Sequence, residues 1–217
     1  SESVTEGHPD KLCDYISDTI LDEALKQDKY SRVAIETFAS ANQITIAGQL
    51  TTNATLDIEK IVRDRIKEIG YDRADLDIDY RTCKIDINIT KQSSDIAQGV
   101  DIGGAGDQGI MFGYASDETE EYMPFAISMA HKLAKRLTEV RKNGIIPYLR
   151  PDGKTQVTVE YEDGIVKRID TILISNQHEE SADMDILKKD VMEKVIKTVI
   201  PEKYLDENTK YFINPTG

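Results

Sequence analysis

The chain has 217 residues, of which 39% are hydrophobic and 31% charged, as in a globular protein with one large domain or two small ones. Forty acidic residues against 27 basic ones give a net charge of −13, which argues against a dedicated nucleic-acid binder but leaves room for a nucleotide held by a local cation or by metal ions. No apolar run reaches the ~20 residues of a membrane span, and no signal peptide is visible. The two cysteines, Cys13 and Cys83, lack CxxC spacing, so we expect a cytoplasmic protein without a disulfide or zinc site.

The first half of the chain predicts the order helix, strand, strand, helix, strand. Apolar residues at helical spacing indicate the helices, and strict alternation of apolar and polar residues indicates the last strand. Asp57 is the expected N-cap of the second helix, and Gly70 is its expected stop. The expected elements are a helix over 11–25, strands over 32–38 and 43–50, a helix over 57–69 and a strand over 83–90.

The second half repeats this order. The dipeptide Asp163-Gly164 between two strand patterns is a strong hairpin signal. A further short strand is expected at GIMFGYA, residues 109–115, ahead of the repeated set. The other expected elements are a helix over 124–141, strands over 155–161 and 166–175, a helix over 183–199 and a strand over 210–214.

This element order predicts an α+β fold of repeated two-layer units in the order β-α-β-β-α-β. Each unit has a mostly antiparallel sheet with its helices on one face. The glycine-rich stretch from Gly99 to Gly109 is the natural junction between the units. The other face of each sheet is polar and would meet water, a partner subunit or a ligand.

The segment GHPDK, residues 7–11, is the first candidate site. His8 and Asp10 stand where the first predicted helix begins, and free N–H groups at a helix N-terminus favour phosphate. Asp10 could bind Mg²⁺, which often takes only one or two carboxylates and shares substrate phosphates. The alternative is structural, with Asp10 capping the helix and His8 in a loop.

Two further candidates carry carboxylates or amides. Glu36 lies in mid-strand between Ala34 and Phe38, where a carboxylate is either metal-bound or simply solvated and paired. The run over 91–109 places Gln98 and Asp107 among five glycines, as in a mobile ligand loop or a flexible linker. This run is neither a Walker A loop nor a dinucleotide fingerprint.

Two segments in the second half are also polar. In RPDGK, residues 150–154, the Pro-Asp-Gly segment is typical of a tight turn, which is a sufficient structural reason for these residues. The same turn could also place Lys154 within reach of a phosphate. The stretch from Asn176 to Glu180 looks metal-like, but we interpret it as a polar strand end. His131 and the acids over 117–121 are interpreted as structural.

Taken together, five segments resemble the S-adenosylmethionine synthetase (methionine adenosyltransferase) family. They are SESVTEGHPDKLCDYISD, KQSSDIAQGV, GAGDQGIMFGYASDETEEYMP, RPDGKTQVTVEY and YFINPTG, in this order and from residue 1 to residue 217. The resemblance implies synthesis of S-adenosylmethionine from ATP and L-methionine, followed by cleavage of tripolyphosphate to phosphate and pyrophosphate. It also implies a fold of three similar α+β units related by pseudo-threefold repetition.

The resemblance implies a role for each matching residue. His8 would assist departure of the tripolyphosphate, and Asp152 and Lys154 would bind ATP. Gln98 and Asp107 would lie near methionine, with Asp107 pairing its ammonium group.

The family's metal ligands and assembly carry over in the same way. Asp10 matches a Mg²⁺ ligand, and Glu36 matches a K⁺ ligand. The resemblance further implies a homo-oligomer, a dimer or a dimer of dimers, with active sites between subunits and without a nucleic-acid or membrane partner.

The chain departs from the family pattern in three places. First, we expect only two domains, whereas the family continues into a third unit with another Mg²⁺ ligand. The expected limits are an N-terminal domain over 1–98, a junction over 99–108 and a central domain over 109–217. The segment between Gln98 and GAGDQG is shorter than usual, and Gln49 stands where a methionine-contacting Glu is normal. The alternatives are a non-catalytic two-domain fragment that binds ATP or a partner, and a plain acidic interaction domain.

Overall fold

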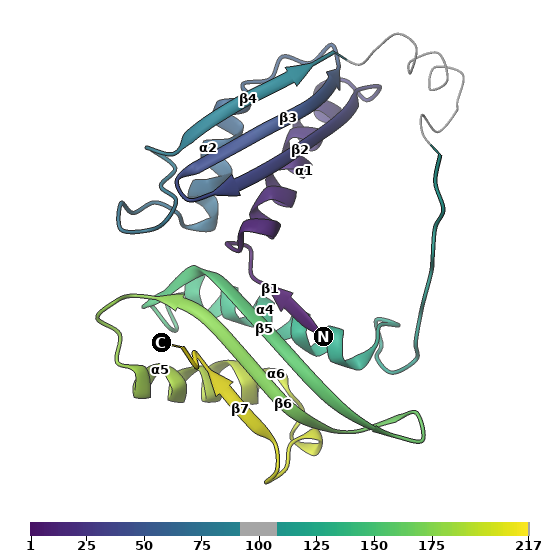
Figure 1. Cartoon of the computed structure of the whole chain (residues 1–217), viewed down its shortest axis with the longest axis vertical. Helices are drawn as coiled ribbons and strands as arrows, with labels where there is room; N and C mark the ends of the chain where they lie inside the picture. Colours follow the sequence, from purple (N-terminus) through teal and green to yellow (C-terminus); the bar gives the residue numbers. More distant parts are fainter. Residues whose placement is uncertain (92–107, 217) are drawn as a thin grey trace. The chain divides into compact units, whose positions relative to one another are not determined.

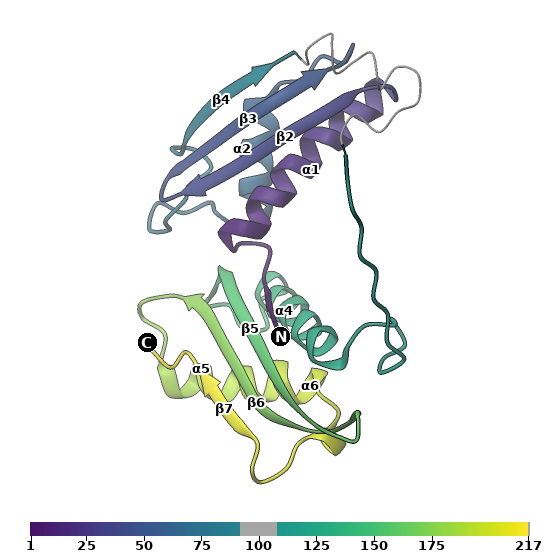
Figure 2. The ribbon, with the colours of Figure 1, turned by 45° about the vertical axis from the view of Figure 1, so that its right-hand side comes forward.

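The computed structural model describes residues 1–91 and 108–216, which form two compact units (Figures 1 and 2). Unit 1 comprises Ser1–His8 and Tyr114–Gly217, and unit 2 comprises Pro9–Gly113. Both units are α+β, and three of the five described strand pairs are antiparallel, which confirms the predicted fold class.

Unit 2 contains two helices and a three-stranded sheet in the order β2-β3-β4. Its elements are α1 (Pro9–Gln27), β2 (Arg32–Ser40), β3 (Gln43–Thr51), α2 (Ile58–Ile69) and β4 (Lys84–Thr90). β2 and β3 form an antiparallel hairpin, while β4 runs parallel to β3. The helix α2 provides the crossover that a parallel pair requires.

Both helices of unit 2 cover the same face of its sheet (Figure 1). The fully buried side chains of this core include Leu12, Ile16, Ile20, Ile44, Ile46, Val62, Ile66 and Ile69. Asp57 caps α2 by accepting from the N–H of Lys60, and Gly70 ends the helix in the left-handed region with φ of 112°. The predicted start and stop of this helix are therefore confirmed.

Unit 1 repeats the order helix, strand, strand, helix, strand around a sheet in the order β1-β5-β6-β7. Its elements are β1 (Glu2–Val4), α4 (Phe125–Lys142), β5 (Leu149–Glu162), β6 (Ile165–His178), α5 (Met184–Val191), the π-helical turn η1 (Met192–Ile196), α6 (Lys197–Val199), the 3₁₀ turn η2 (Glu202–Tyr204) and β7 (Lys210–Ile213). The helix predicted over 183–199 is thus α5, η1 and α6 in succession. β6 and β7 are parallel, and the other pairs are antiparallel.

The core of unit 1 lies between its helices and one face of this sheet (Figure 2). Its fully buried side chains include Leu133, Leu137, Val157, Ile172, Ile174, Leu187 and Val191. Asp163 and Gly164 both have positive φ, 52° and 78°, as in a type I′ turn, which confirms the hairpin predicted between β5 and β6.

The strand expected over 109–115 is wrong. Residues 108–116 have no strand neighbour within the described chain, and Ile110, Met111 and Phe112 are 83%, 92% and 94% exposed. An apolar strand pattern forms a strand only where a neighbour accepts its backbone hydrogen bonds. In unit 1, the sheet edge beside β5 is instead filled by β1, which the sequence analysis missed.

The domain limits expected from the sequence remain a prediction, because nearly all of the 99–108 junction lies outside the described residues. Residues 1–8 pack with the second half of the chain rather than with the residues that follow them. None of the described helices is both long and apolar enough to traverse a bilayer.

Candidate active site

An open pocket of about 520 Å³ lies beside the start of β5 and the end of β6 in unit 1. It is lined by His8, Asp152, Gly153, Lys154, Ser175, Asn176, Gln177, His178, Asn214 and Thr216. Four stretches that are far apart in the sequence therefore meet here. Three of the predicted site residues, His8, Asp152 and Lys154, share this single pocket.

His8 is placed by the close approach of two backbone segments. Its N–H donates to the carbonyl oxygen of Thr5 (3.1 Å), and its side chain is half-buried. A Cβ added to Gly7 would lie only 2.4 Å from the carbonyl carbon of Pro151. Residue 7 must therefore be glycine for His8 to reach the start of β5.

Asp152 and Lys154 lie within β5, so the turn predicted at Pro-Asp-Gly is wrong. β5 already begins at Leu149, and its register with β6 shifts between Leu149 and Gly153. This irregularity accommodates Pro151, which has no N–H to offer a regular ladder. Alternation along the strand then buries Leu149, Pro151 and Gly153 and leaves Asp152 and Lys154 half-buried on the other face.

The pocket combines a cation, an imidazole and a carboxylate. Lys154 pairs with Ser175 in the strand register. Its ammonium lies 3.7 Å from the Glu2 carboxylate, and its side chain is 42% exposed. This loose pairing leaves the ammonium accessible to an anionic ligand. A lysine in this setting binds phosphate as a point charge, and a histidine beside it can donate a hydrogen bond to a phosphate oxygen.

The end of β6 supplies side chains to the pocket that were not predicted from the sequence to be functional. Asn176, Gln177 and His178 do form a polar strand end, as predicted, but they also line the pocket. The Oε1 of Gln177 is buried and has no hydrogen-bond partner among the described residues. One signal was present in the sequence. Ser175 and Gln177 are two residues apart in the strand, so they lie on the same face, and this is also the face of Lys154, which pairs with Ser175.

Two other predicted residues lie on the open face of the sheet in unit 2. Glu36 pairs in register with Ala47 and is exposed, so it carries no burial cost. Gln49 lies between Ala34 and Thr90 in the register and is half-buried. This face is opposite the one that packs under the helices.

Asp10 lies in the first turn of α1 and is exposed. A carboxylate in this position is favoured by the positive end of the helix dipole. Within the ranges 1–91 and 108–216, no three His, Cys, Asp or Glu side chains cluster as a metal site. A cation at Asp10 or Glu36 would therefore take its other ligands from elsewhere. Gln98 and Asp107 lie outside the described residues.

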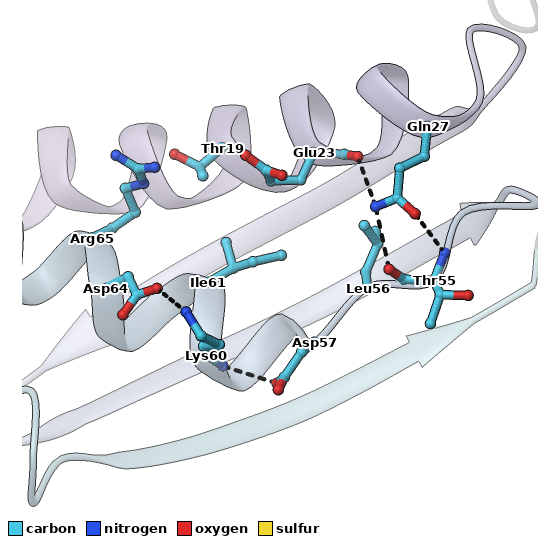
Figure 3. A pocket seen from close by; sticks show the side chains of 10 residues that line it. All are labelled: Thr19, Glu23, Gln27, Thr55, Leu56, Asp57, Lys60, Ile61, Asp64 and Arg65. Carbon is cyan, nitrogen blue, oxygen red and sulfur yellow. Dashed lines mark hydrogen bonds and ion pairs between the residues drawn. The ribbon is translucent and has the colours of Figure 1, made fainter.

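A second groove, in unit 2, has a structural explanation (Figure 3). It lies between α1 and α2, and most of its polar groups bind one another. Lys60 pairs with Asp64 (2.6 Å), and the side chain of Gln27 binds both the N–H and the carbonyl oxygen of Thr55. Because these groups are already paired, we assign the functional site to the pocket in unit 1.

Comparison with known proteins gives the family. Residues 1–94 match the N-terminal domain of S-adenosylmethionine synthetase, and residues 102–217 match its central domain. The chain is 55% identical to the S-adenosylmethionine synthase of Clostridium tetani over 231 residues, and 57% identical to that of Desulfosudis oleivorans over 224 residues. These alignments cover 100% of this chain but only 59% and 58% of the relatives, so the chain spans less than two thirds of their length. The two domain matches, together with the pocket formed by their motifs, show that the chain belongs to the S-adenosylmethionine synthetase family.

Proposed function

We propose that the protein makes S-adenosylmethionine from ATP and L-methionine and then hydrolyses the tripolyphosphate to phosphate and pyrophosphate. The observation that carries the proposal is the meeting of His8, Asp152 and Lys154 in one pocket, from segments more than 140 residues apart. The relatives are named S-adenosylmethionine synthases, which supports the same reaction class.

The proposed reaction requires alignment of the two substrates and stabilisation of the leaving group's negative charge, rather than a general base. The methionine sulfur attacks the ribose C5′ carbon, the C5′–O bond breaks, and tripolyphosphate leaves with the electron pair. A thioether sulfur carries no proton to remove, so the protein must align the reactants and stabilise the departing negative charge. His8 and Lys154, which both line the pocket, would stabilise that charge, with His8 donating a hydrogen bond to the leaving oxygen as its charge develops.

We infer that methionine is bound by Gln49, Gln98 and Asp107. Gln49 supports this role because its amide lies on the open sheet face of unit 2. Asp107 would pair with the methionine ammonium, and Gln98 would lie beside the amino acid.

The residues present fit Mg²⁺ and K⁺ as cofactors. Asp10 offers one exposed carboxylate, which suits Mg²⁺ because this ion commonly takes one or two carboxylates together with substrate phosphates. Glu36 offers an exposed carboxylate for K⁺. When bound, the metal ions would neutralise phosphate charge, while the chain's own contribution is to hold the two carboxylates in place.

We further propose a homo-oligomer, a dimer or a dimer of dimers, with active sites between subunits and a cytoplasmic location. The open sheet faces support an assembly, since Phe38 and Phe212 are 67% and 44% exposed. We assign residues 1–98 to the N-terminal domain, 99–108 to a junction and 109–217 to the central domain.

The test is turnover by the protein at its full natural length. His8→Ala should lower kcat about 10²-fold or more while changing the KM for ATP much less, since its contribution grows as the leaving group develops. Lys154→Ala should weaken ATP handling, and Lys154→Arg should restore it only in part.

Lys188→Ala, at an exposed position of α5, is the matched control and should behave as wild type. Wild-type kcat in His8→Ala would remove His8 from the chemistry. The alternative of a non-catalytic binding fragment predicts ATP binding without any S-adenosylmethionine formed.

A further inference from the structure

Two asparagines form a reciprocal pair at the edge of the pocket. The N–H of Asn176 donates to Oδ1 of Asn214 (2.9 Å), and Nδ2 of Asn214 donates to the carbonyl oxygen of Asn176 (2.9 Å). Both residues are less than 10% exposed. The side-chain amide of Asn214 thus continues the β6–β7 pairing one residue past the end of β7 at Ile213.

Asn176 also reaches the neighbouring strand. Its Nδ2 donates to the carbonyl oxygens of Arg150 (3.0 Å) and Gln177 (2.7 Å), so both of its side-chain donors are used. Arg150 lies in the irregular stretch of β5, where the regular ladder is interrupted. At this irregularity, Asn176 supplies a hydrogen-bond donor to the Arg150 carbonyl oxygen. A Cβ on Gly153 would lie 2.5 Å from Oδ1 of Asn176, so the two residues are in close contact.

The same network continues to His8. Thr5 donates from its N–H to the carbonyl oxygen of Gly153 (2.9 Å) and from Oγ1 to that of Pro151 (2.7 Å), while its own carbonyl accepts from the N–H of His8. Each of the four pocket segments is thereby tied to the next by buried or partly buried hydrogen bonds. The network ends at Asn214 on one side and at His8 on the other.

Asparagine suits position 214 for two independent reasons. Its backbone has φ of 43°, a left-handed conformation that asparagine adopts more readily than most residues. Its amide also supplies the donor and the acceptor that the pair requires, whereas aspartate could only accept and would bring a charge into a buried site.

We propose that Asn176 and Asn214 are positioning residues, which set the placement of His8, Asp152 and Lys154 around the phosphates of the nucleotide. This inference rests on the proposed function, because the phosphates belong to that reaction. The amides of both residues are engaged with the protein, so they act through the residues they hold. The sequence pattern predicts only a polar strand end at Asn176 and no role for Asn214.

The test compares three variants. Asn214→Gly keeps the left-handed backbone and removes the amide, whereas Asn214→Asp keeps the acceptor and loses the donor. Asn208→Gly, at an exposed position of the same connection to β7, is the control. Because misplacement by about 1 Å costs about 10²-fold in rate, Asn214→Gly should lower kcat by about 10- to 100-fold. Asn214→Asp should also lower kcat, since it loses the donor and brings a charge into a buried site.

The KM for methionine separates positioning from general loosening. We expect it to stay unchanged in Asn214→Gly, since methionine is assigned to residues outside this network, whereas general loosening of the active site would raise it. Partial unfolding lowers apparent kcat without changing KM, so kcat is corrected for the folded fraction measured by thermal unfolding. A folded Asn214→Gly with wild-type kcat would overturn the inference.

A second measurement needs no substrate. The chain has three histidines, so the NMR signal of the His8 ring can be assigned by substitution. We expect it to shift in Asn214→Gly and Asn214→Asp but not in Asn208→Gly. An unmoved His8 signal would refute the positioning role, even if the wild type made no S-adenosylmethionine and the proposed function failed.

Discussion

The contact between Gly7 and Pro151 gives a direct test of how His8 is held. In Gly7→Ala, the new Cβ would lie 2.4 Å from both the carbonyl carbon and the Cβ of Pro151, and 2.5 Å from its carbonyl oxygen. Ordinary contacts begin at 3.4 Å, so the two segments must separate by about 1 Å. The obstructing atoms are backbone and a proline ring, which no side-chain rotation can move aside.

The magnitude follows from this overlap. Forced overpacking of a well-packed site costs about 1–3 kcal/mol, which for a chain of this size lowers Tm by roughly 2–12 °C. The larger effect should be on the reaction, because a displacement of about 1 Å at His8 costs about 10²-fold in kcat.

The assay measures thermal unfolding of the chain and turnover of the protein at its full natural length. The matched control for unfolding is Gly113→Ala, since an added Cβ at Gly113 meets no atom within 4 Å. If Gly7→Ala unfolds at the wild-type Tm and retains wild-type kcat, the close approach is not what places His8.

Two further predictions concern other residues. Gln49→Glu should lower the KM for methionine about fivefold with little change for ATP, because a charge-assisted hydrogen bond to the ammonium adds about 1 kcal/mol over a neutral one; an unchanged or higher KM would show that Gln49 does not meet the ammonium. In Glu118, hydrogen bonds from the Tyr161 hydroxyl, the Phe125 N–H and the Ser116 hydroxyl lower the carboxyl pKa. Such a group stabilises the fold above its unfolded pKa of about 4.3, and this contribution is lost as pH falls through the lower folded value. Urea unfolding should therefore show Glu118→Gln less stable than wild type at pH 7, with the difference shrinking below about pH 4; a pH-independent difference would refute this assignment.

Local chemistry made the elements of the fold predictable. Helix caps and hairpin turns are encoded within a few residues, and Asp57, Gly70 and Asp163-Gly164 adopt the predicted conformations. The buried stripe of α1 follows from spacing alone. By contrast, β1 has only three residues, and its existence depends on β5, which lies about 150 residues away. No local pattern contains that information.

The candidate site was predictable only in part, for the same reason. The resemblance to a family named His8, Asp152 and Lys154, and the structure places them in one pocket. The turn predicted at the Pro-Asp-Gly segment is wrong, because pairing of β5 with β6 overrides the turn propensity of these residues. The positioning role proposed for Asn176 and Asn214 could not be predicted from the sequence. The role of a buried asparagine depends on its hydrogen-bond partners, and these partners are distant in the sequence.

The division of the GHPDK motif between the two units has a consequence for the proposed metal site. His8 belongs to unit 1 and its pocket, whereas Asp10 opens the first helix of unit 2. Two residue steps span at most about 7 Å between Cα atoms, so Asp10 stays close to His8 however the units are arranged. A metal ion at Asp10 would therefore always lie within reach of phosphates held by His8.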